Sequence, residues 1–312
     1  MKNSRRKKVK EDAISILRGI SIRMPLMIYG AKVENEDEEL TIAANRIRQM
    51  VRAADRLFFD FINAKDCFPN ASIGGGVNYI LWNRSCEGDC YITTIRGNEK
   101  SAEYRPLNEF DVFIRYNDAI HIVKKCHSEE NFSSLVNARN PFGLSSNVRG
   151  TTVGELSLIP SQGRSKLPLN AVAQNNTLVN KYKILMSKVT AEHAGEPDKN
   201  GQFKIISRTE IIGPKEVCTD SYLIIGASQD RKVVENEYKY ISTCFARFLL
   251  MLAVSPINLS ADKFKFIPMQ YFTESSDIDW NRSVKEIDAQ LYAKYDLSDE
   301  EIAFIESMIK PM

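Results

Sequence analysis

The stretch Asp66-Cys-Phe-Pro-Asn-Ala-Ser-Ile-Gly-Gly-Gly-Val-Asn-Tyr-Ile-Leu-Trp82 decides the fold class of this chain. Its three glycines signal a turn or bulge, and the short apolar run Val77–Trp82 follows them directly, which favours a strand over a helix. Similar runs alternate with turn residues up to the C-terminus. The other predicted strands are Cys90–Ile95, Asp111–Tyr116, Tyr182–Val189, Phe203–Ser207, Tyr222–Ile225 and Phe264–Met269.

Helical patterns lie between these runs. One helix is expected at Asp118–Cys126, with Asn117 as its N-cap, and a longer one at Val233–Val254. A third, Asp299–Ile309, begins after Ser298 and has Glu301 at the spacing of a capping box. The sequence therefore predicts a mixed α/β (α+β) domain. Two stretches rich in Gly, Ser and Asn interrupt it, at Pro141–Gly150 and Pro160–Asn176, and the second is expected to be a mobile loop.

Before residue 66 the pattern is different. Residues 1–39 run from the basic Arg5-Arg-Lys-Lys8 to an acidic end, and residues 40–65 form a long predicted helix. Its apolar residues repeat at alternating spacings of four and three, which gives a heptad seam that could pack on its own domain or mediate self-association. The seam consists of Ala43, Ile47, Met50, Ala54, Leu57 and Phe61.

Composition narrows the class of protein. Lys and Arg number 42 against 40 Asp and Glu, so any nucleic-acid surface must come from local segregation of charge. The longest apolar run, Phe248–Val254, is too short for a membrane span, and the basic N-terminus lacks the apolar region of a signal peptide. Six sparse cysteines do not form the pattern of a secreted disulfide framework. We expect a cytoplasmic protein with reduced thiols and no membrane partner.

Several motifs resemble one family of bacterial proteins. The segment Asp66–Trp82, together with the motifs given below, resembles the region downstream of the methyltransferase core in restriction-modification proteins that fuse helicase-like and adenine-methylating domains. These motifs are Arg139-Asn-Pro-Phe-Gly143, Ser187-Lys-Val189, Glu192-His-Ala-Gly-Glu-Pro-Asp198, Glu216-Val-Cys-Thr-Asp-Ser-Tyr-Leu223 and Asp299-Glu-Glu-Ile-Ala-Phe-Ile-Glu-Ser-Met-Ile-Lys-Pro-Met312. The resemblance implies that residues 66–312 form a target-recognition domain. Within residues 1–39, the run Leu17-Arg-Gly-Ile-Ser-Ile-Arg-Met-Pro-Leu-Met-Ile-Tyr-Gly-Ala31 resembles the tail of the helicase part in the same proteins.

The catalytic part of that family is missing from this sequence. The first half of the segment 40–65 resembles a helix upstream of the methyltransferase core and the second half a segment downstream of it, which places the junction near Leu57 to Asp60. The only Asn-Pro pair, Asn140-Pro141-Phe142, lacks the second proline of an adenine methyltransferase loop. Ile73–Val77 does not lead into a helix, as a donor-binding loop would, and no phosphate-binding loop of a helicase occurs. No cofactor is expected, although the family uses S-adenosylmethionine.

Two arrangements of residues could in principle bind a metal ion. Asp198 with Glu237-Tyr-Lys239 imitates the acidic pair and lysine of a restriction endonuclease, which would make the chain a nuclease subunit. Cys86 and Cys90 with Cys126 and His127 could supply four zinc ligands, but the second pair is adjacent in sequence, which makes joint coordination awkward. We therefore predict no metal site.

Double-stranded DNA is the expected partner. Arg and Lys can neutralise phosphates or read guanine, and Asn can pair with adenine. Such residues cluster in the loop-rich middle of the chain, where a solvated charged face is the alternative interpretation. The predicted DNA-binding residues are Arg139, Asn140, Arg149, Arg164, Lys166, Lys183, Lys188 and Arg208. The sequence thus predicts a recognition subunit, catalytically incomplete by itself, that works with a methyltransferase or restriction subunit, self-associates through Ala43–Phe61, or is a remnant without activity.

Overall fold

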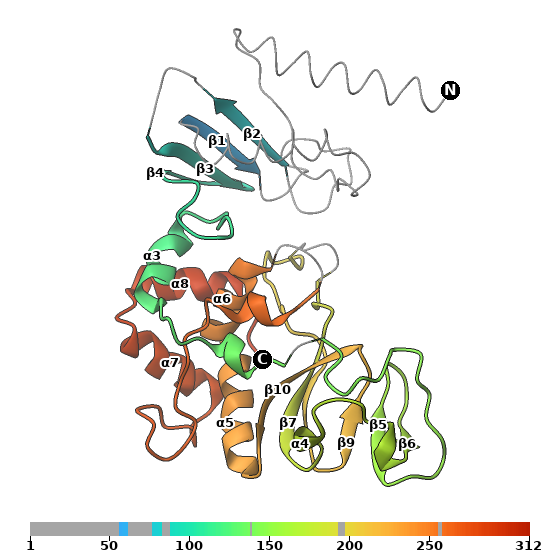
Figure 1. Ribbon diagram of the computed structural model, residues 1–312. Helices are drawn as coiled ribbons and strands as arrows, with labels where there is room; N and C mark the ends of the chain where they lie inside the picture. Colours follow the sequence, from blue (N-terminus) through green and yellow to red (C-terminus); the bar gives the residue numbers. More distant parts are fainter. Residues whose placement is uncertain (1–55, 62–76, 83–87, 138, 193–196, 255–257) are drawn as a thin grey trace, which may run out of the picture.

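The computed structural model describes residues 56–61, 77–82, 88–137, 139–192, 197–254 and 258–312. Within these ranges the chain forms three small sheets and a group of helices, which confirms the mixed α/β class (Figure 1). The segment 1–39 and most of the segment 40–65 lie outside the described ranges. No helix in those ranges combines the length and apolar character that a bilayer crossing requires.

The first sheet corrects the prediction of a helix through Lys65. Residues Arg56–Phe61 form strand β1, which pairs antiparallel with β2 (Val77–Trp82) and parallel with β3 (Cys90–Arg96). Strand β4 (Glu99–Arg105) completes the order β2-β1-β3-β4. The expected junction at Leu57 to Asp60 therefore lies inside a strand, and the sheet spans the predicted domain boundary at residue 66. Pairing on both sides outweighs the helical spacing of apolar residues in this short segment.

Buried polar contacts attach this sheet to the segment that follows it. The Asp60 carboxylate is buried and accepts two hydrogen bonds of 2.7 Å from the Arg115 guanidinium. Asn117 is buried as well: its amide donates to the carbonyl of Ile92 at 2.9 Å, and its Oδ1 accepts from Arg105 at 3.1 Å. Helix α3 (Asp118–Cys126) begins directly afterwards, as predicted, but Asn117 does not cap it with its side chain.

The central sheet carries a core on each face. Strands β7 (Tyr182–Ser187), β8 (Thr209–Ile212) and β10 (Tyr222–Ser228) pair antiparallel in the order β10-β7-β8. Alternate side chains of a strand point to opposite faces, so Ile184 and Met186 of β7 enter the larger core while Leu185 enters the smaller one. Apolar residues on both faces of one strand indicate a strand that is covered on both sides.

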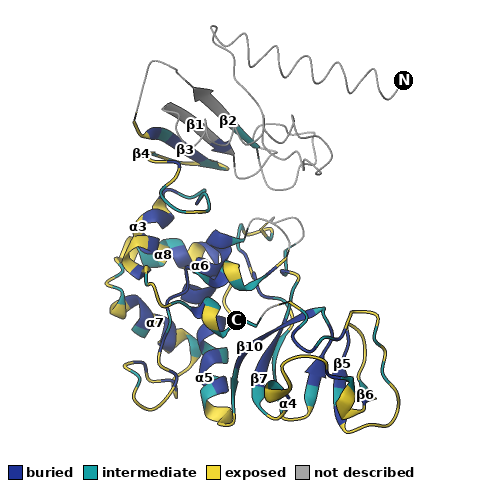
Figure 2. Cartoon of the chain, in the orientation of Figure 1, coloured by how far each residue is buried: buried dark blue, intermediate teal, exposed yellow. Residues whose placement is uncertain are grey.

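Helices cover one face of this sheet. They are α5 (Arg231–Ser242), α6 (Cys244–Ala253), α7 (Val284–Lys294) and α8 (Asp299–Met308) (Figure 1). The single helix predicted at Val233–Val254 is broken at Thr243, whose hydroxyl accepts from the amide of Ala246 at 3.1 Å and so begins α6. Every residue of α6 is buried, as Figure 2 shows. The predicted capping box of Ser298 and Glu301 is confirmed at the start of α8.

A second three-stranded sheet covers the other face. Strands β5 (Leu156–Ile159), β6 (Ser165–Leu167) and β9 (Glu216–Cys218) have the order β6-β5-β9 and enclose the smaller core. The stretch 160–176, predicted as a mobile loop, contains β6 and the turn η3 (Leu169–Ala171). Pairing with β5 fixes this segment, which its polar composition did not indicate. The short helix α4 (Asn176–Val179) leads on to β7.

Three predicted strands are absent, each because its backbone groups bond elsewhere. At Asp111–Tyr116 the carbonyls of Ile114 and Arg115 accept from the side chains of Arg105 and Thr94. At Phe203–Ser207 a single bridge to Ile309 is followed by Ile205, whose φ of 64° ends any strand. Phe264–Met269 begins at the last residue of η5 (Ala261–Phe264) and contains only the bridging residue Pro268. The remaining turn, η2, spans Phe132–Leu135.

Candidate nucleic-acid interface

Basic residues are concentrated in the middle of the chain. Residues 139–188 contain seven Lys and Arg but a single acidic residue, Glu155, whereas the whole chain has a net charge of only +2. Most of this segment belongs to the sheet β6-β5-β9 and the loops around it, which we call the strand lobe (residues 139–181 and 209–221). Positive charge is therefore concentrated in the first part of the strand lobe, residues 139–181, whereas residues 209–221 contribute the acidic side chains of Glu210, Glu216 and Asp220.

Two predicted residues stand at the exposed edge of the strand lobe. Thr151 pairs with Lys166 through two backbone hydrogen bonds of 2.8 Å, which sets Arg149 close to the outer strand β6. The side chains of Arg149 and Lys166 are exposed, and Arg149 donates to the carbonyl of Ser146 at 2.7 Å. Neither cation is in an ion pair within the described residues, so both are available to an anionic partner.

Two further predicted arginines belong to an ion-pair network. Arg164 binds Glu216 and lies 3.5 Å from the carboxylate of Glu210, which also binds Arg208. Arg208 donates to the Tyr222 hydroxyl at 2.8 Å, and its guanidinium lies 5.4 Å from the centre of the Tyr222 ring. The two arginines share acidic partners, so each keeps only part of its charge for a ligand, and the network holds their positions at the surface.

Of the two remaining predicted lysines, Lys183 lies in β7 and Lys188 directly follows it. Lys183 is fully buried: its ammonium donates to the carbonyls of Lys181 at 2.9 Å and Gly213 at 3.1 Å. Burial disfavours the charged form and lowers the pKa of Lys183 to about 8. Lys183 has no surface from which to reach a phosphate, so its prediction as a DNA contact is wrong. Lys188 is mostly buried and paired with Asp220.

Arg139 and Asn140 begin the strand lobe in a tight turn. Asn140 has a φ of 56°, a left-handed conformation that Asn tolerates better than most residues, and its carbonyl accepts from the amide of Gly143 at 3.1 Å. The Asn140 side-chain oxygen is buried and lacks a hydrogen-bond partner among the described residues. Arg139 is exposed. The turn therefore presents Arg139, while the amide of Asn140 is oriented inward.

Sequence reasoning missed a polar cluster on the helical side. Arg247 of α6 is fully buried and donates to the backbone carbonyls of Ser242, Thr243, Lys204 and Lys310 at 3.1, 3.2, 3.4 and 2.7 Å. Asp288 of α7 accepts hydrogen bonds from the first two backbone amides of α6, those of Cys244 and Phe245, at 2.9 Å each. Burial is the main influence on this carboxyl and raises its pKa to about 6. Both side chains supply hydrogen bonds to backbone groups that would otherwise be unpaired. The sequence signal that could have indicated this cluster is the single Arg within the apolar run 244–253.

The acidic motif Glu192–Asp198 has a structural role where it is described. The Glu192 carboxylate accepts from the amides of Lys204 and Ile205, which stabilises the left-handed residue Ile205. Asp198 accepts from the amides of Asn200 and Gln202 at 2.8 and 3.1 Å. Residues 193–196 lie outside the described ranges. Both carboxylates thus bind backbone N–H groups, Asp198 within its own turn and Glu192 in a segment twelve residues further along the chain.

The nuclease-like triplet does not come together. Glu237 lies buried against Gly226, and Lys239 donates to the carbonyls of Trp280 and Arg282. Asp198 is 3.4 Å from the ammonium of Lys310. Among the residues that the structure describes, no three His, Cys, Asp or Glu side chains gather as a set of metal ligands. Of the zinc candidates, Cys126 is buried and Cys86 lies outside the described residues.

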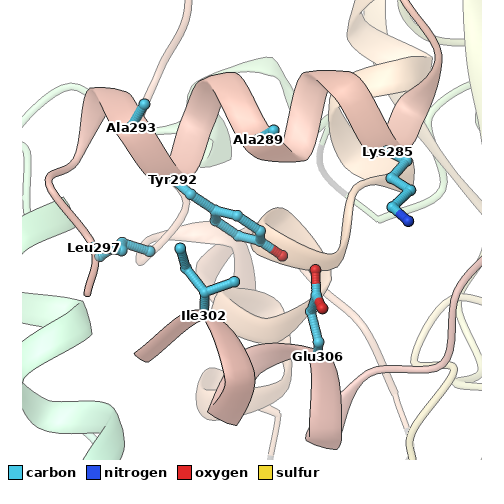
Figure 3. Close-up of a pocket in the computed structure, with 7 residues that line it drawn as sticks. All are labelled: Lys285, Ala289, Tyr292, Ala293, Leu297, Ile302 and Glu306. Carbon is cyan, nitrogen blue, oxygen red and sulfur yellow. The ribbon is translucent and has the colours of Figure 1, made fainter. Parts of the chain in front are cut away.

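A pocket of about 430 Å³ lies on the helical side, between α7 and α8. Figure 3 shows its lining, in which the Tyr292 ring and Ile302 form an apolar centre and Lys285 and Glu306 lie toward one end. The Tyr292 hydroxyl is buried without a hydrogen-bond partner in the described structure. The pocket belongs to a part of the fold remote in sequence from the strand lobe, and its mixed charge does not suit a polyanion.

The chain was also compared with known proteins. A scan against protein-family models gave no match, and a search of curated proteins gave none either.

Proposed function

We propose that this chain binds double-stranded DNA through the strand lobe and acts as a recognition subunit. The observation that carries the proposal is the placement of Arg139, Arg149 and Lys166 as exposed cations outside any ion pair in the described structure, within a basic segment of the chain. Cations of this kind bind duplex DNA by releasing the counterions condensed on its phosphates. The resemblance to the region downstream of restriction-modification methyltransferase cores supports the same function.

The partner protein follows from what the sequence lacks. Its similar segments flank the position of a methyltransferase core without containing its motifs, so a separate methyltransferase or restriction subunit would supply the chemistry. We place this activity in the cytoplasm. The seam Ala43–Phe61 remains a proposed contact for such a partner or a second copy, although its last positions, Leu57 and Phe61, belong to β1 and only the residues before 56 are left for a helix.

A salt titration of duplex binding tests the proposal. We expect the affinity for a fluorescent random-sequence duplex to fall steeply with salt, with a slope in log–log form of about −0.9 for each phosphate neutralised. Lys166→Met should reduce the magnitude of that slope by about 0.9. The matched control is Lys183→Met, which removes a buried lysine of the neighbouring strand β7 and should leave the slope unchanged.

Two results would contradict the proposal. The first is the absence of duplex binding by the folded wild-type protein at low salt. The second is an unchanged slope when Arg139, Arg149 and Lys166 are all replaced by Met, since binding would then occur on another surface. Circular dichroism of each variant verifies that the fold is retained.

A further inference from the structure

Two large apolar side chains are exposed at the tip of the strand lobe. Val153 is 76% and Leu169 is 55% exposed, although most apolar residues of this lobe lie in its core. Their segments are adjacent, because Gly154 packs against the backbone of Leu167 and the Glu155 carboxylate accepts from the amide of Leu169 at 3.2 Å. We call Val153 and Leu169 the apolar tip. Single exposed apolar residues are common on protein surfaces, so the tip gains meaning from the close packing and the charges around it.

The apolar tip is held by close backbone packing. Gly150 has a φ of 72°, and a Cβ there would lie 2.4 Å from Ser165 Oγ and 2.7 Å from the carbonyl oxygen of Lys166. Gly154 has a φ of 150°, and a Cβ there would lie 2.4 Å from the carbonyl oxygen of Leu167. The Thr151 hydroxyl donates to the carbonyl of Val153 at 2.6 Å. The backbone is therefore preformed, and little ordering entropy is lost when the tip binds.

The charges around the tip select its partner. Arg149 and Lys166 are exposed on the two segments that carry the tip and lie outside any ion pair in the described structure, whereas Arg164, after the turn at Gly163, is paired with Glu216. The nearby acidic residue Glu155 is already bonded to a backbone amide. Apolar side chains flanked by unpaired cations are the arrangement by which proteins wedge into the minor groove, where Arg and Lys bind the groove and phosphates while the apolar groups unstack a base step.

We propose that Val153 and Leu169 form a wedge that enters the minor groove of duplex DNA and opens a flexible base step. This inference rests on the proposed function, because it requires that the strand lobe binds DNA. It adds a source of selectivity that needs no hydrogen bond to a base edge: pyrimidine–purine steps such as TA unstack at lower cost than the stiff steps of an A-tract. The wedge would therefore favour duplexes with such steps.

The test compares two duplexes of equal length, one rich in TA steps and one an A-tract, each with a donor and an acceptor dye at its ends. The wild type should bind the TA duplex roughly tenfold more tightly and shorten the distance between its ends. The double variant Val153→Ser/Leu169→Ser should lose the preference and the bend but keep the slope with salt. Val189→Ser, at an exposed valine outside the strand lobe, is the control and should retain both.

The outcomes separate the two proposals. If the double variant keeps the preference and the bend, the wedge is wrong while DNA binding by the strand lobe stands. If the wild type binds both duplexes equally and bends neither, the wedge is also wrong. Absence of binding to either duplex overturns the proposed function together with the wedge. If the double variant changes the sedimentation coefficient of the free protein but not the DNA measurements, the tip contacts a second copy, and the wedge is again overturned.

Discussion

On the helical side of the central sheet, the charged groups Arg247 and Asp288 are buried and bond to backbone atoms, whereas on the strand side Arg149 and Lys166 stand in solvent. Both sides share strand β7, and both carry charged residues in or beside apolar sequence. The difference lies in what the charge contacts. A guanidinium that satisfies several carbonyls contributes to folding, while a surface cation outside an ion pair contributes mainly to binding.

Replacing Arg247 should have the largest effect. Arg247→Met leaves the carbonyls of Lys204 and Lys310 without their donor and Asp288 without its nearby cation, so the free energy of unfolding should fall by about 3–5 kcal/mol. Urea unfolding followed by tryptophan fluorescence measures this. Arg149→Met on the strand side is the matched control, with an expected change within about 0.5 kcal/mol. If the two variants lost the same free energy of unfolding, the buried Arg247 and the exposed Arg149 would not differ in their contribution to folding.

A buried carboxyl on the helical side should make stability depend on pH. Desolvation raises the pKa of Glu237 to about 7, above its ordinary value near 4.5, so the folded state holds a proton that the unfolded state has released. The stability gained from that proton is complete below about pH 4.5 and is lost as the pH rises through 7. Between pH 5 and pH 8 the free energy of unfolding should fall by on the order of 2–3 kcal/mol through this group.

Glu237→Gln removes this contribution. The variant should be more stable than the wild type at pH 8 and should show a weaker dependence on pH, which urea unfolding at both pH values would measure. The pKa of Asp288 is also raised, to about 6, so this group lowers the stability of both proteins as the pH rises. Identical pH profiles for the wild type and the variant would contradict the buried position of Glu237.

On the strand side, backbone packing at a glycine should matter more than charge. Gly154→Ala places a Cβ against the backbone of Leu167, in a conformation that alanine rarely adopts, and should cost about 2 kcal/mol. Gly163→Ala is the matched control, because its φ is also positive but its Cβ would meet open space, and it should cost about 1 kcal/mol. Thermal unfolding compares them. A Gly163→Ala loss as large as that of Gly154→Ala would show that the close packing at the tip is unimportant.

The smallest effect should come from the ion-pair network. Glu210→Gln removes a negative charge shared by Arg164 and Arg208, and its stability should change by less than about 1 kcal/mol because these groups are largely solvent-exposed. The same variant should bind duplex DNA about two- to fivefold more tightly at low salt. Fluorescence anisotropy measures the affinity. Weaker binding would mean that Glu210 positions the arginines rather than neutralising them.

Local sequence signals predicted two of the helices correctly, but they missed α7 (Val284–Lys294). The capping box of Ser298 and Glu301 and the amphipathic pattern of Asp118–Cys126 depend on residues close in sequence, and both elements form where expected. The break at Thr243 was missed because the apolar pattern continues through it. Thr is nevertheless a favoured N-cap residue, so its presence could have indicated that a new helix begins there. The helix predicted across Arg56–Phe61 was overruled by pairing with β2 and β3, which no local pattern reveals.

The site was less predictable than the fold. The alternation of side chains along β7 could have placed Lys183 on the same face as Leu185, and so in a buried position. The clustering of basic residues in the sequence does not separate buried cations from exposed ones. The pairing of Arg164 and Arg208 with acidic residues depends on strands β8 and β9, which were not predicted. The apolar tip could not be identified either, since the segments that carry Val153 and Leu169 are adjacent only because Gly150 and Gly154 allow their backbones to approach.

Strand β7 places alternate side chains in two different cores, and this arrangement has a consequence for evolution. Substitutions in β7 disturb both cores at once, so selection for folding restricts the strand on both faces. The loop segments 143–154 and 160–164 do not belong to that strand, and many of their residues are exposed. Their sequences can therefore diverge quickly between related chains while the sheet beneath them stays the same, so that a new binding preference can arise without a new fold.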